Sequence, residues 1–484
     1  MVSYVLRVDT TPSAIAISRD VVHTCLTPDR HHETGADRVA AATRGARARA
    51  AYDPAAVVSA AEVQVPGPRA ALGAAGAPSV RGPRVGLLCG NFDPTRDGVA
   101  DYTRRLAAQL GEAGLDACIL TTHEHARAQG GPAAGVTTGW NLPGVLRASR
   151  GIAALDLDLV HLQFAPSAFA FRRAVGLLPE LLRNGPPIVV TLHEYAVSRP
   201  PRLLRPVLGL KAWDWETLRL VPTATRLVVV TDEQAAELVA GSRGAAERVV
   251  RMPVGTNVAV SALDRDAARA AVRRRLQAPA DAPVVVFFGF LHQKKRLADL
   301  VEATAVVRRS YPQVRLVLAG GMESHSVAKE DALSMRRDLE RVVAARQLVD
   351  AVSFTGFLGE QEVSGLLHGS DVAVLPFPEG GSWKSGSLLA ALSHGLPTVV
   401  TGPAARGAPD VGDGVLRVAA GDVGALADAV SRVLTDRGLS GRLREGAVAA
   451  AGRRSWPDIT ARHVEMYRDV LASSKHRHLS RRRR

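Results

Sequence analysis

Residues 372–402, VAVLPFPEGGSWKSGSLLAALSHGLPTVVTG, combine a cation, a carboxylate and several glycines in one short loop. An apolar run of strand length leads into the loop, which holds Glu379 and Lys384, and a helix is expected to begin at Ser387. A helix N-terminus offers unpaired N–H groups and a partial positive charge, so it suits a phosphate. Lys384 would add charge, and Glu379 could accept hydrogen bonds from hydroxyl groups. A plain loop between two core elements is the alternative. The backbone donors expected to face an anion are those of Gly386, Ser387, Leu388 and Leu389.

A second basic loop follows another apolar run. Gly289 ends the run PVVVFFG, and Lys294 and Lys295 come just before a helix predicted over 297–310. The chain has 61 lysines and arginines, of which six are lysine, so a lysine marks an unusual position. A flexible ammonium beside a helix start is a suitable partner for a diphosphate. A solvated basic turn is the alternative.

A third loop, in the segment GNFDPTRDGVADYTRRL (residues 90–106), also joins an apolar run to a helical pattern. Gly98 would let the backbone approach a ligand closely at the start of that helix. An ordinary turn capped by Asp97 is equally compatible with the spacing. No GxGxxG motif follows this strand, which disfavours a nicotinamide-dependent dehydrogenase.

Two strand-like segments of the first half end in polar side chains. VHLQF carries His161 and Gln163 at alternate positions, and VTLHEY carries His193 and Glu194. A histidine at the carboxyl end of a parallel strand can donate to a substrate hydroxyl or phosphate, or move a proton. Buried structural histidines are the alternative, and His193 is the preferred site residue because a polar turn follows it directly.

The elements that must position these residues alternate along the chain. Helical patterns, including one over 171–183, separate the strand candidates, and this alternation predicts parallel sheets covered on both faces. The pattern restarts near residue 264, so we expect an α/β fold with two doubly wound, Rossmann-like domains facing each other across a cleft. The strand candidates are 84–90, 118–121, 159–162, 188–192, 227–230, 283–290, 314–320, 351–357, 372–377 and 398–402.

Composition narrows the class of protein further. A chain of 484 residues with 46% hydrophobic residues is neither wholly disordered nor fibrous. Cys25, Cys89 and Cys118 fit no metal-binding spacing and are interpreted as reduced thiols, which favours a cytoplasmic protein. No stretch approaches 18 uninterrupted apolar residues, so no transmembrane helix is predicted.

Of the net charge of +14, six units lie in the last twelve residues, SSKHRHLSRRRR, which carry six cations and no acid. Such a run is typical of a solvated, disordered tail. Weak contact with an anionic membrane surface through Arg481, Arg482, Arg483 and Arg484 is a secondary hypothesis, which would make the protein peripheral at the inner membrane face. Nucleic acid is disfavoured because no aromatic residues are interleaved with the arginines.

The order of these motifs resembles the GT-B-fold glycosyltransferases of family 4, which are retaining enzymes that use nucleotide sugars. The likeness covers roughly residues 84–472. It is carried by the residues from Gly98 to Tyr102, VHLQF, TLHEY, PVGTN at 253–257, the residues from Gly289 to Lys295, VSFTGF and SLLAALSHGLPTVVT.

The resemblance implies a donor site in the C-terminal half and an acceptor site in the N-terminal half. Lys295 matches the lysine that binds the donor diphosphate, His193 the histidine near the transferred sugar, and the loop at Gly98 the one that closes over the donor. Glu379 would hold sugar hydroxyls. The catalytic residues are thus expected to be His193, Lys295 and Glu379. The donor-binding set is Gly98, Gly289, Lys294, Lys295, Lys384, Gly386, Ser387, Leu388 and Leu389. The acceptor side would have His161, Gln163 and Glu194.

Composition, the repeated α/β pattern and the resemblance together predict the domain organisation. We expect a low-complexity, disordered leader over 1–82, an acceptor-binding domain over 83–258 and a nucleotide-sugar-binding domain over 259–455. A helix over 456–472 would return to the N-terminal domain, followed by a basic tail over 473–484. No metal or other cofactor is expected, since Asp156-Leu157-Asp158 precedes a strand rather than following one.

The chain departs from the family pattern at two places. Gly289-Phe290-Leu291 stands where members usually have Gly-Arg-Leu, so one phosphate-binding arginine is missing. The Glu-x7-Glu pair is also degenerate, because counting from Glu379 reaches Ser387, and aligning from Gly395 puts Ser382 and Ala390 in the two positions.

The predicted function is transfer of a hexose-type sugar from a nucleoside diphosphate sugar to a hydroxyl of a glycan, glycolipid or small molecule, with retention of configuration. The degenerate pair motivates a first alternative, a non-catalytic GT-B-fold protein that binds a partner of glycan assembly. A nucleotide-sugar epimerase is the second alternative.

Overall fold

The computed structural model describes residues 82–131, 133–194, 219–242, 244–322, 329–378, 380–402 and 414–482. The predicted leader, apart from its last residue, lies outside this part of the chain, and so do Cys25 and Glu379. Cys89 and Cys118 are described, and both are free thiols.

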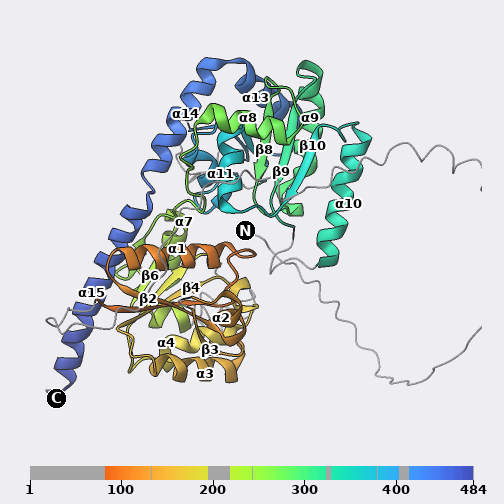
Figure 1. The fold of residues 1–484 in the computed structure, drawn as a ribbon. Helices are drawn as coiled ribbons and strands as arrows, with labels where there is room; N and C mark the ends of the chain where they lie inside the picture. The colour runs from red at the N-terminus through yellow and green to blue at the C-terminus, as the bar shows by residue number, and fades with distance from the viewer. Residues whose placement is uncertain are drawn as a thin grey trace, which may run out of the picture. The chain divides into compact units, whose positions relative to one another are not determined.

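The first half of the described chain forms a sheet of seven parallel strands in the order β3-β2-β1-β4-β5-β6-β7 (Figure 1). The strands are β1 (Arg84–Cys89), β2 (Asp116–Thr122), β3 (Ala133–Thr137), β4 (Leu159–Phe164), β5 (Ile188–Leu192), β6 (Arg226–Val229) and β7 (Val249–Arg251). The helices are α1 (Gly98–Glu112), α2 (His123–Gln129), α3 (Leu142–Ala153), α4 (Leu178–Leu181), α6 (Val221–Thr223) and α7 (Asp232–Gly241).

The second half forms a parallel sheet of six strands in the order β10-β9-β8-β11-β12-β13. The strands are β8 (Val284–Phe288), β9 (Arg315–Ala319), β10 (Val352–Gly356), β11 (Val372–Leu375), β12 (Thr398–Thr401) and β13 (Val415–Val418). The helices are α8 (Arg265–Arg275), α9 (Leu297–Ser310), α10 (Lys329–Ala345), α11 (Glu360–Gly369), α12 (Gly386–Ser393), α13 (Val423–Thr435) and α14 (Arg437–Gly452). Figure 1 shows α8, α9 and α11 flanking the strands of this sheet.

Both sheets are covered on both faces, which explains their apolar sequences. Side chains alternate between the faces of a strand, so Leu87 and Leu88 of β1 enter two different hydrophobic clusters. In the same way, Phe287 and Val286 of β8 belong to separate clusters of the second domain. This burial confirms the predicted fold of two doubly wound α/β domains.

The strand order marks one point in each domain where ligands of this type of fold bind. In the first sheet the order reverses between β1 and β4, and in the second it reverses between β8 and β11. Ligands of doubly wound folds bind outside the carboxyl ends of the strands at such points. The loop after β8, which carries Lys295, and the loop between β11 and α12 both begin at this edge of the second sheet.

The C-terminal helix differs from the prediction. α15 runs from Trp456 to Arg482, so the prediction of a helix ending at 472 and a disordered tail was wrong. After Pro457 in its first turn, no glycine or proline interrupts the helix. α15 packs against α1 of the first domain, as expected for a returning helix. The other domain boundaries stay predictions.

A helix predicted over 171–183 was also wrong. This segment contains a 3₁₀ turn at Arg173–Leu177, and the single turn of α4 follows it. Ala170 and Phe171 precede it with positive φ angles of 51° and 56°, which interrupt any helix. Among the described residues, no helix is long and apolar enough to cross a bilayer.

Candidate functional site

Three predicted donor-site residues meet at the carboxyl edge of the second sheet. Gly289 follows β8 with a φ of 133°, a conformation that favours glycine. A Cβ at this position would lie 2.3 Å from Ser387 Oγ and 3.2 Å from Lys295 Nζ. Gly289 therefore leaves the space in which the hydroxyl of α12 and the ammonium of the β8 loop approach each other.

The Lys295 ammonium is held in an apolar environment. Its Nζ lies 5.3 Å from the centre of the Phe377 ring and 5.6 Å from that of Phe287. Burial lowers the pKa of Lys295 to about 8, so most molecules still carry the charge at pH 7. Within the described residues no carboxylate pairs with Lys295. A cation that is desolvated and has no counter-ion is well prepared to bind an anion.

The start of α12 agrees only in part with the prediction. Its N-cap is Ser385, whose Oγ accepts a hydrogen bond from the N–H of Leu388 at 3.3 Å and whose carbonyl accepts from Leu389 at 3.0 Å. These two N–H groups are therefore not available to an anion. The N–H groups of Gly386 and Ser387 have no hydrogen bond within the described chain, so the anion-binding donors reduce to these two.

The remaining predicted donor residues are not gathered at this point. Lys294 is exposed on the short 3₁₀ turn Gln293–Lys295, and its N–H donates to His292 Nδ1. Desolvation lowers the pKa of Lys384, while the carboxylates of Glu194, Glu233 and Glu237 in the first domain act in the opposite direction. Lys384 is thus electrostatically linked to the first domain.

Gly98 is the first residue of α1, and a Cβ there would meet no atom within 4 Å. The space in front of this helix is therefore open, as a ligand-covering loop requires. Asp97 is the N-cap, and its Oδ1 accepts from the N–H of Val99 at 3.0 Å. Both interpretations of this loop, a capped turn and an approach to a ligand, are compatible with this geometry.

At the carboxyl edge of the first sheet, His193 is tied to its neighbours. Its Nε2 donates to Gln163 Oε1 at 2.9 Å, which joins the ends of β5 and β4. The Tyr102 ring of α1 lies edge-on to the imidazole at 5.0 Å. Burial, reinforced by the Lys384 charge, lowers the pKa of His193 to about 3. The ring is therefore neutral at pH 7, and Nδ1 is left as a hydrogen-bond acceptor.

His161 does not lie at an open edge. It is fully buried, its Nδ1 bonds the Tyr467 hydroxyl of α15 at 2.6 Å, and its Nε2 bonds Thr191 Oγ1 at 2.7 Å. Both ring nitrogens are occupied by protein groups, so the predicted acceptor contact is corrected to a packing role between β4 and α15. Glu194 is exposed just after His193.

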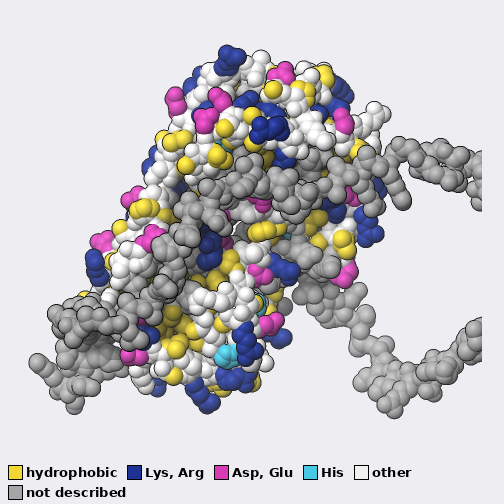
Figure 2. Space-filling view, viewed as in Figure 1, with side chains coloured by type: hydrophobic (Ala, Val, Ile, Leu, Met, Phe, Trp, Pro, Cys, Tyr) yellow, Lys and Arg dark blue, Asp and Glu magenta, His cyan; other side chains and the backbone are white. Residues whose placement is uncertain are grey.

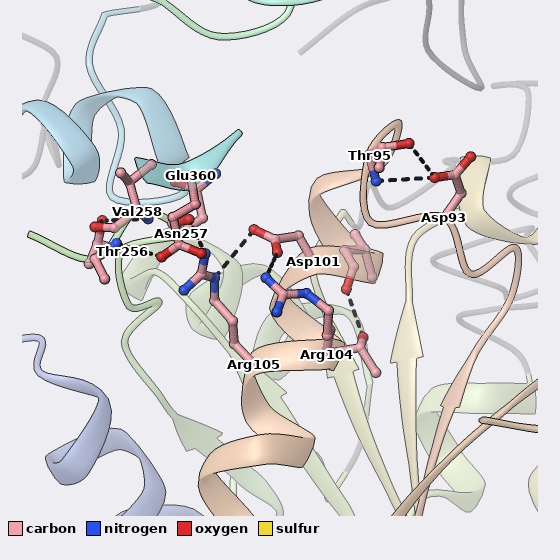
Figure 3. A network of polar contacts seen from close by, with 12 residues as sticks. Asp93, Thr95, Asp101, Arg104, Arg105, Thr256, Asn257, Val258 and Glu360 are labelled. Carbon is pink, nitrogen blue, oxygen red and sulfur yellow. Dashed lines mark hydrogen bonds and ion pairs between the residues drawn. The ribbon is translucent and has the colours of Figure 1, made fainter. Parts of the chain in front are cut away.

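A polar network between the two domains was not predicted (Figure 3). Arg105 of α1 donates to the carbonyl of Asn257 and pairs with Glu360 of α11 at 2.8 Å. Glu360 also accepts from the N–H of Ala259 at 2.8 Å. Asn257 in turn lies against the start of α12, 3.2 Å from where a Cβ of Gly386 would be. The Asp101–Arg105 spacing is a helix pair that sequence can suggest, but nothing local indicates Glu360.

The fold and these loops define a class: two Rossmann-like domains with an anion-binding edge in the second. Comparisons with known proteins identify this class. A model of glycosyl transferases group 1 matches residues 282–436, and a model of the glycosyl transferase 4-like domain matches 97–255. A D-inositol 3-phosphate glycosyltransferase of Saccharomonospora viridis is 30% identical over 344 residues, which cover 68% of this chain and 74% of the relative. The chain belongs to the GT-B-fold glycosyltransferases of family 4.

Solved structures share the fold. Sucrose-phosphate synthase from Thermosynechococcus elongatus superposes with a TM-score of 0.61 at 21% identity, covering 81% of this chain and 100% of that one. HepE of Anabaena in complex with UDP and glucose gives a TM-score of 0.59 at 16% identity, covering 80% and 99%. The predicted family and fold are confirmed, whereas the roles of single site residues stay predictions.

Proposed function

We propose that this glycosyltransferase takes its sugar from a nucleoside diphosphate sugar and transfers it to a hydroxyl group with retention of configuration. One observation carries the proposal: Lys295 Nζ and Ser387 Oγ converge on the space left by Gly289. The N–H groups of Gly386 and Ser387, at the start of the same helix, have no hydrogen-bond partner within the described chain. The arrangement suits a diphosphate, which gains charge as the sugar leaves. UDP in the HepE complexes supports this donor class, and retention is what membership of family 4 implies.

In this mechanism the leaving diphosphate is stabilised by Lys295 and by the positive end of α12. His193 contacts the transferred sugar, and its neutral ring accepts a hydrogen bond from a sugar hydroxyl at Nδ1 while Gln163 fixes the tautomer. Glu379, which lies outside the described residues, would accept from other sugar hydroxyls. The departing diphosphate takes the acceptor proton on the same face of the sugar. No metal or other cofactor enters this scheme.

The acceptor is a hydroxyl of a glycan, a glycolipid or a small polyol. The matched relative's name, D-inositol 3-phosphate glycosyltransferase, supports a polyol among these classes. Residues of the first domain near His193, including the exposed Glu194, would form its binding surface. Gln163, predicted on the acceptor side, is fully buried and instead holds the His193 ring in place.

The test is release of nucleoside diphosphate from a panel of nucleotide sugars, with and without candidate acceptors. We expect Lys295→Ala to lower kcat/KM by about 100-fold or more, because one preorganised donor to the developing charge is lost. Lys294→Ala should have a much smaller effect, and Arg309→Ala, an exposed cation at the end of α9, serves as the matched control. Turnover and donor affinity that survive in Lys295→Ala would contradict the site.

A second candidate function is a binding protein without turnover, motivated by the degenerate Glu pair. In the alignment from Gly395, Ala390 takes the second position of that pair, and it is fully buried in α12, so it offers no group to ribose hydroxyls. A protein that is thermally stabilised by a nucleoside diphosphate but releases none from any nucleotide sugar would favour this candidate. Turnover of the donor without any acceptor would instead indicate an epimerase.

A further inference from the structure

A pocket lies at the end of the second domain opposite the donor site. It has a volume of about 300 Å³ and lies between α13 and α14, beside Asp371. Asp371 immediately precedes β11, and its N–H donates to the carbonyl of Val284 at the start of β8. The pocket is therefore at the amino edge of the sheet, whereas Lys295 and Ser387 follow the carboxyl edge. Its polar lining consists of Asp371, Arg437, Ser440, Gly441 and Arg444.

The one carboxylate of this lining is already neutralised. Asp371 pairs with Arg269 and with Arg273, whose Nη2 lies 2.6 Å from Oδ2, and it also accepts from the N–H of Val284 at 2.8 Å. Arg273 is only 2% exposed and donates in addition to the carbonyl of Gly369 at 2.8 Å. Two guanidinium groups thus share one carboxylate, so the three groups together carry a net positive charge.

Further arginines have no carboxylate of their own. Arg437 and Arg444 line the pocket, and among the described residues neither forms an ion pair or a side-chain hydrogen bond. Burial lowers the pKa of Arg444. The attraction of Asp371 opposes this shift, and the repulsion from Arg269 adds to it. Burial also lowers the pKa of Arg265 to about 10, helped by Arg444 and Arg269. Among the described residues, its guanidinium donates only to the carbonyl of Ser370, at 3.3 Å.

The acids near these arginines do not remove the excess charge. Asp264 and Asp436 cap α8 and α14, where they accept from N–H groups of their own helices. Asp266 raises the pKa of Arg265. This effect is smaller than the lowering caused by burial and by the two neighbouring arginines, Arg444 and Arg269. Figure 2 shows Lys and Arg side chains gathered over α8, whose sequence RDAARAAVRRR supplies them. Partly desolvated like charges repel one another, and a bound anion would relieve this repulsion.

We propose that this pocket binds a phosphate group, either inorganic phosphate or a phosphomonoester, independently of the donor site. Arg437 and Arg444 present planar forks of N–H donors, which match phosphate oxygens in pairs. Ser440 adds a hydroxyl, and Gly441 adds no side chain to fill the space. A tetrahedral dianion satisfies the shape and the charge together.

Titration calorimetry of the full chain with inorganic phosphate tests the proposal. Because the donor site also attracts phosphate, the titration is repeated with Lys295→Ala, which should retain binding at the pocket. Arg444→Gln and Arg437→Gln should each weaken binding about tenfold or more, the usual effect of losing a charge-assisted hydrogen bond. Arg442→Gln is the matched control, since Arg442 is exposed on the same helix and does not line the pocket.

Arg437 is exposed, so its variant keeps the test valid if Arg444→Gln does not fold. Absence of phosphate binding, binding that both arginine variants retain, or binding lost only in Lys295→Ala would each overturn the proposal. Sedimentation with phosphatidic acid vesicles, compared with phosphatidylcholine vesicles, separates the two sources of the phosphate group. Sedimentation that requires Arg444 would indicate a lipid headgroup, and calorimetric binding without sedimentation would indicate a free phosphate.

Discussion

The carboxyl edges of the two sheets are built from opposite chemistry. In the first domain, His161, Gln163 and His193 are neutral and bonded to protein groups, and α15 closes over part of them. In the second domain, Lys295 has no carboxylate partner and the first N–H groups of α12 have no hydrogen-bond partner among the residues that the structure describes. Interactions that are satisfied internally contribute to stability, whereas donors that are left open are available to a ligand. Changes around the buried His161 should therefore mainly affect stability, and changes at the second edge should mainly affect donor binding.

The largest effect should follow from filling the space at Gly289. In Gly289→Ala the new Cβ would lie 2.3 Å from Ser387 Oγ and would adopt a strained φ of 133°, so α12 or the Lys295 loop must shift. Because a misplacement of about 1 Å can cost about 100-fold in rate, we expect kcat/KM to fall by about that factor. Gly111→Ala in α1, where a Cβ meets nothing within 4 Å, should leave activity as it is. Steady-state kinetics of both variants decides this, and a fully active Gly289→Ala would contradict the donor-site geometry.

Acid should destabilise the first edge. Burial lowers the pKa of His463, which lies beside His161, from 6.5 to about 4. A histidine whose pKa is lowered by folding stabilises the protein above pH 6.5, and this contribution is lost as the pH falls towards 4. The loss corresponds to about 3 kcal/mol in the free energy of unfolding for His463 alone. Urea unfolding at pH 7 and pH 4.5 measures it, and His463→Phe should reduce the difference. Equal stability of the wild-type protein at both pH values would contradict the claim that the buried histidines are neutral in the folded protein.

Tyr467→Phe should affect stability but not donor binding. The variant loses the hydroxyl that bonds His161 Nδ1 at 2.6 Å and leaves a buried ring nitrogen without a partner. The expected cost is about 1–3 kcal/mol in the free energy of unfolding. Denaturant unfolding and nucleoside diphosphate affinity are measured on the same sample. A variant with unchanged stability but weakened affinity would reverse the proposed division between the two edges.

Gln163→Leu should produce the smallest change. The variant removes the acceptor that fixes His193 Nε2 as the donor, so the imidazole is free to change its tautomer. We expect kcat to fall about 3- to 10-fold with little change in KM for the donor, since the effect acts through His193 alone. Gln163→Asn, which keeps the amide on a shorter side chain, shows whether the hydrogen bond itself matters. An equal loss of donor affinity would instead place Gln163 in donor binding.

The sequence predicts the central strands of both sheets because they are buried and continuously apolar. It misses the edge strands β3, β7 and β13, whose sequences AAGVT, VVR and VLRV are short and only partly buried. The site follows the same division. Gly289, Lys295 and Ser387 are predictable because each lies where a strand ends or a helix begins, and parallel topology brings such points together.

Contacts between distant segments could not be predicted in this way. His161 and Tyr467 are 306 residues apart, so no local pattern indicates that the strand-end histidine is buried under α15. Lys294 and Lys295 are adjacent in sequence, and only the 3₁₀ turn with Arg296 at a φ of 48° separates their environments. The N-cap Ser385 likewise binds the Leu388 N–H through its hydroxyl, and because the cap precedes the predicted helix start, its carbonyl accepts from the Leu389 N–H in the first regular bond of the helix.

The most direct test of the account is calorimetric titration of a nucleoside diphosphate, UDP first, into the wild-type protein, Lys295→Ala and Tyr467→Phe. Lys295→Ala should weaken binding at least about tenfold, because it removes the charged partner of the diphosphate. Tyr467→Phe should bind as tightly as the wild-type protein although it is less stable. Equal affinity of Lys295→Ala and the wild-type protein for every nucleoside diphosphate that binds would contradict the claim that the second edge holds the donor.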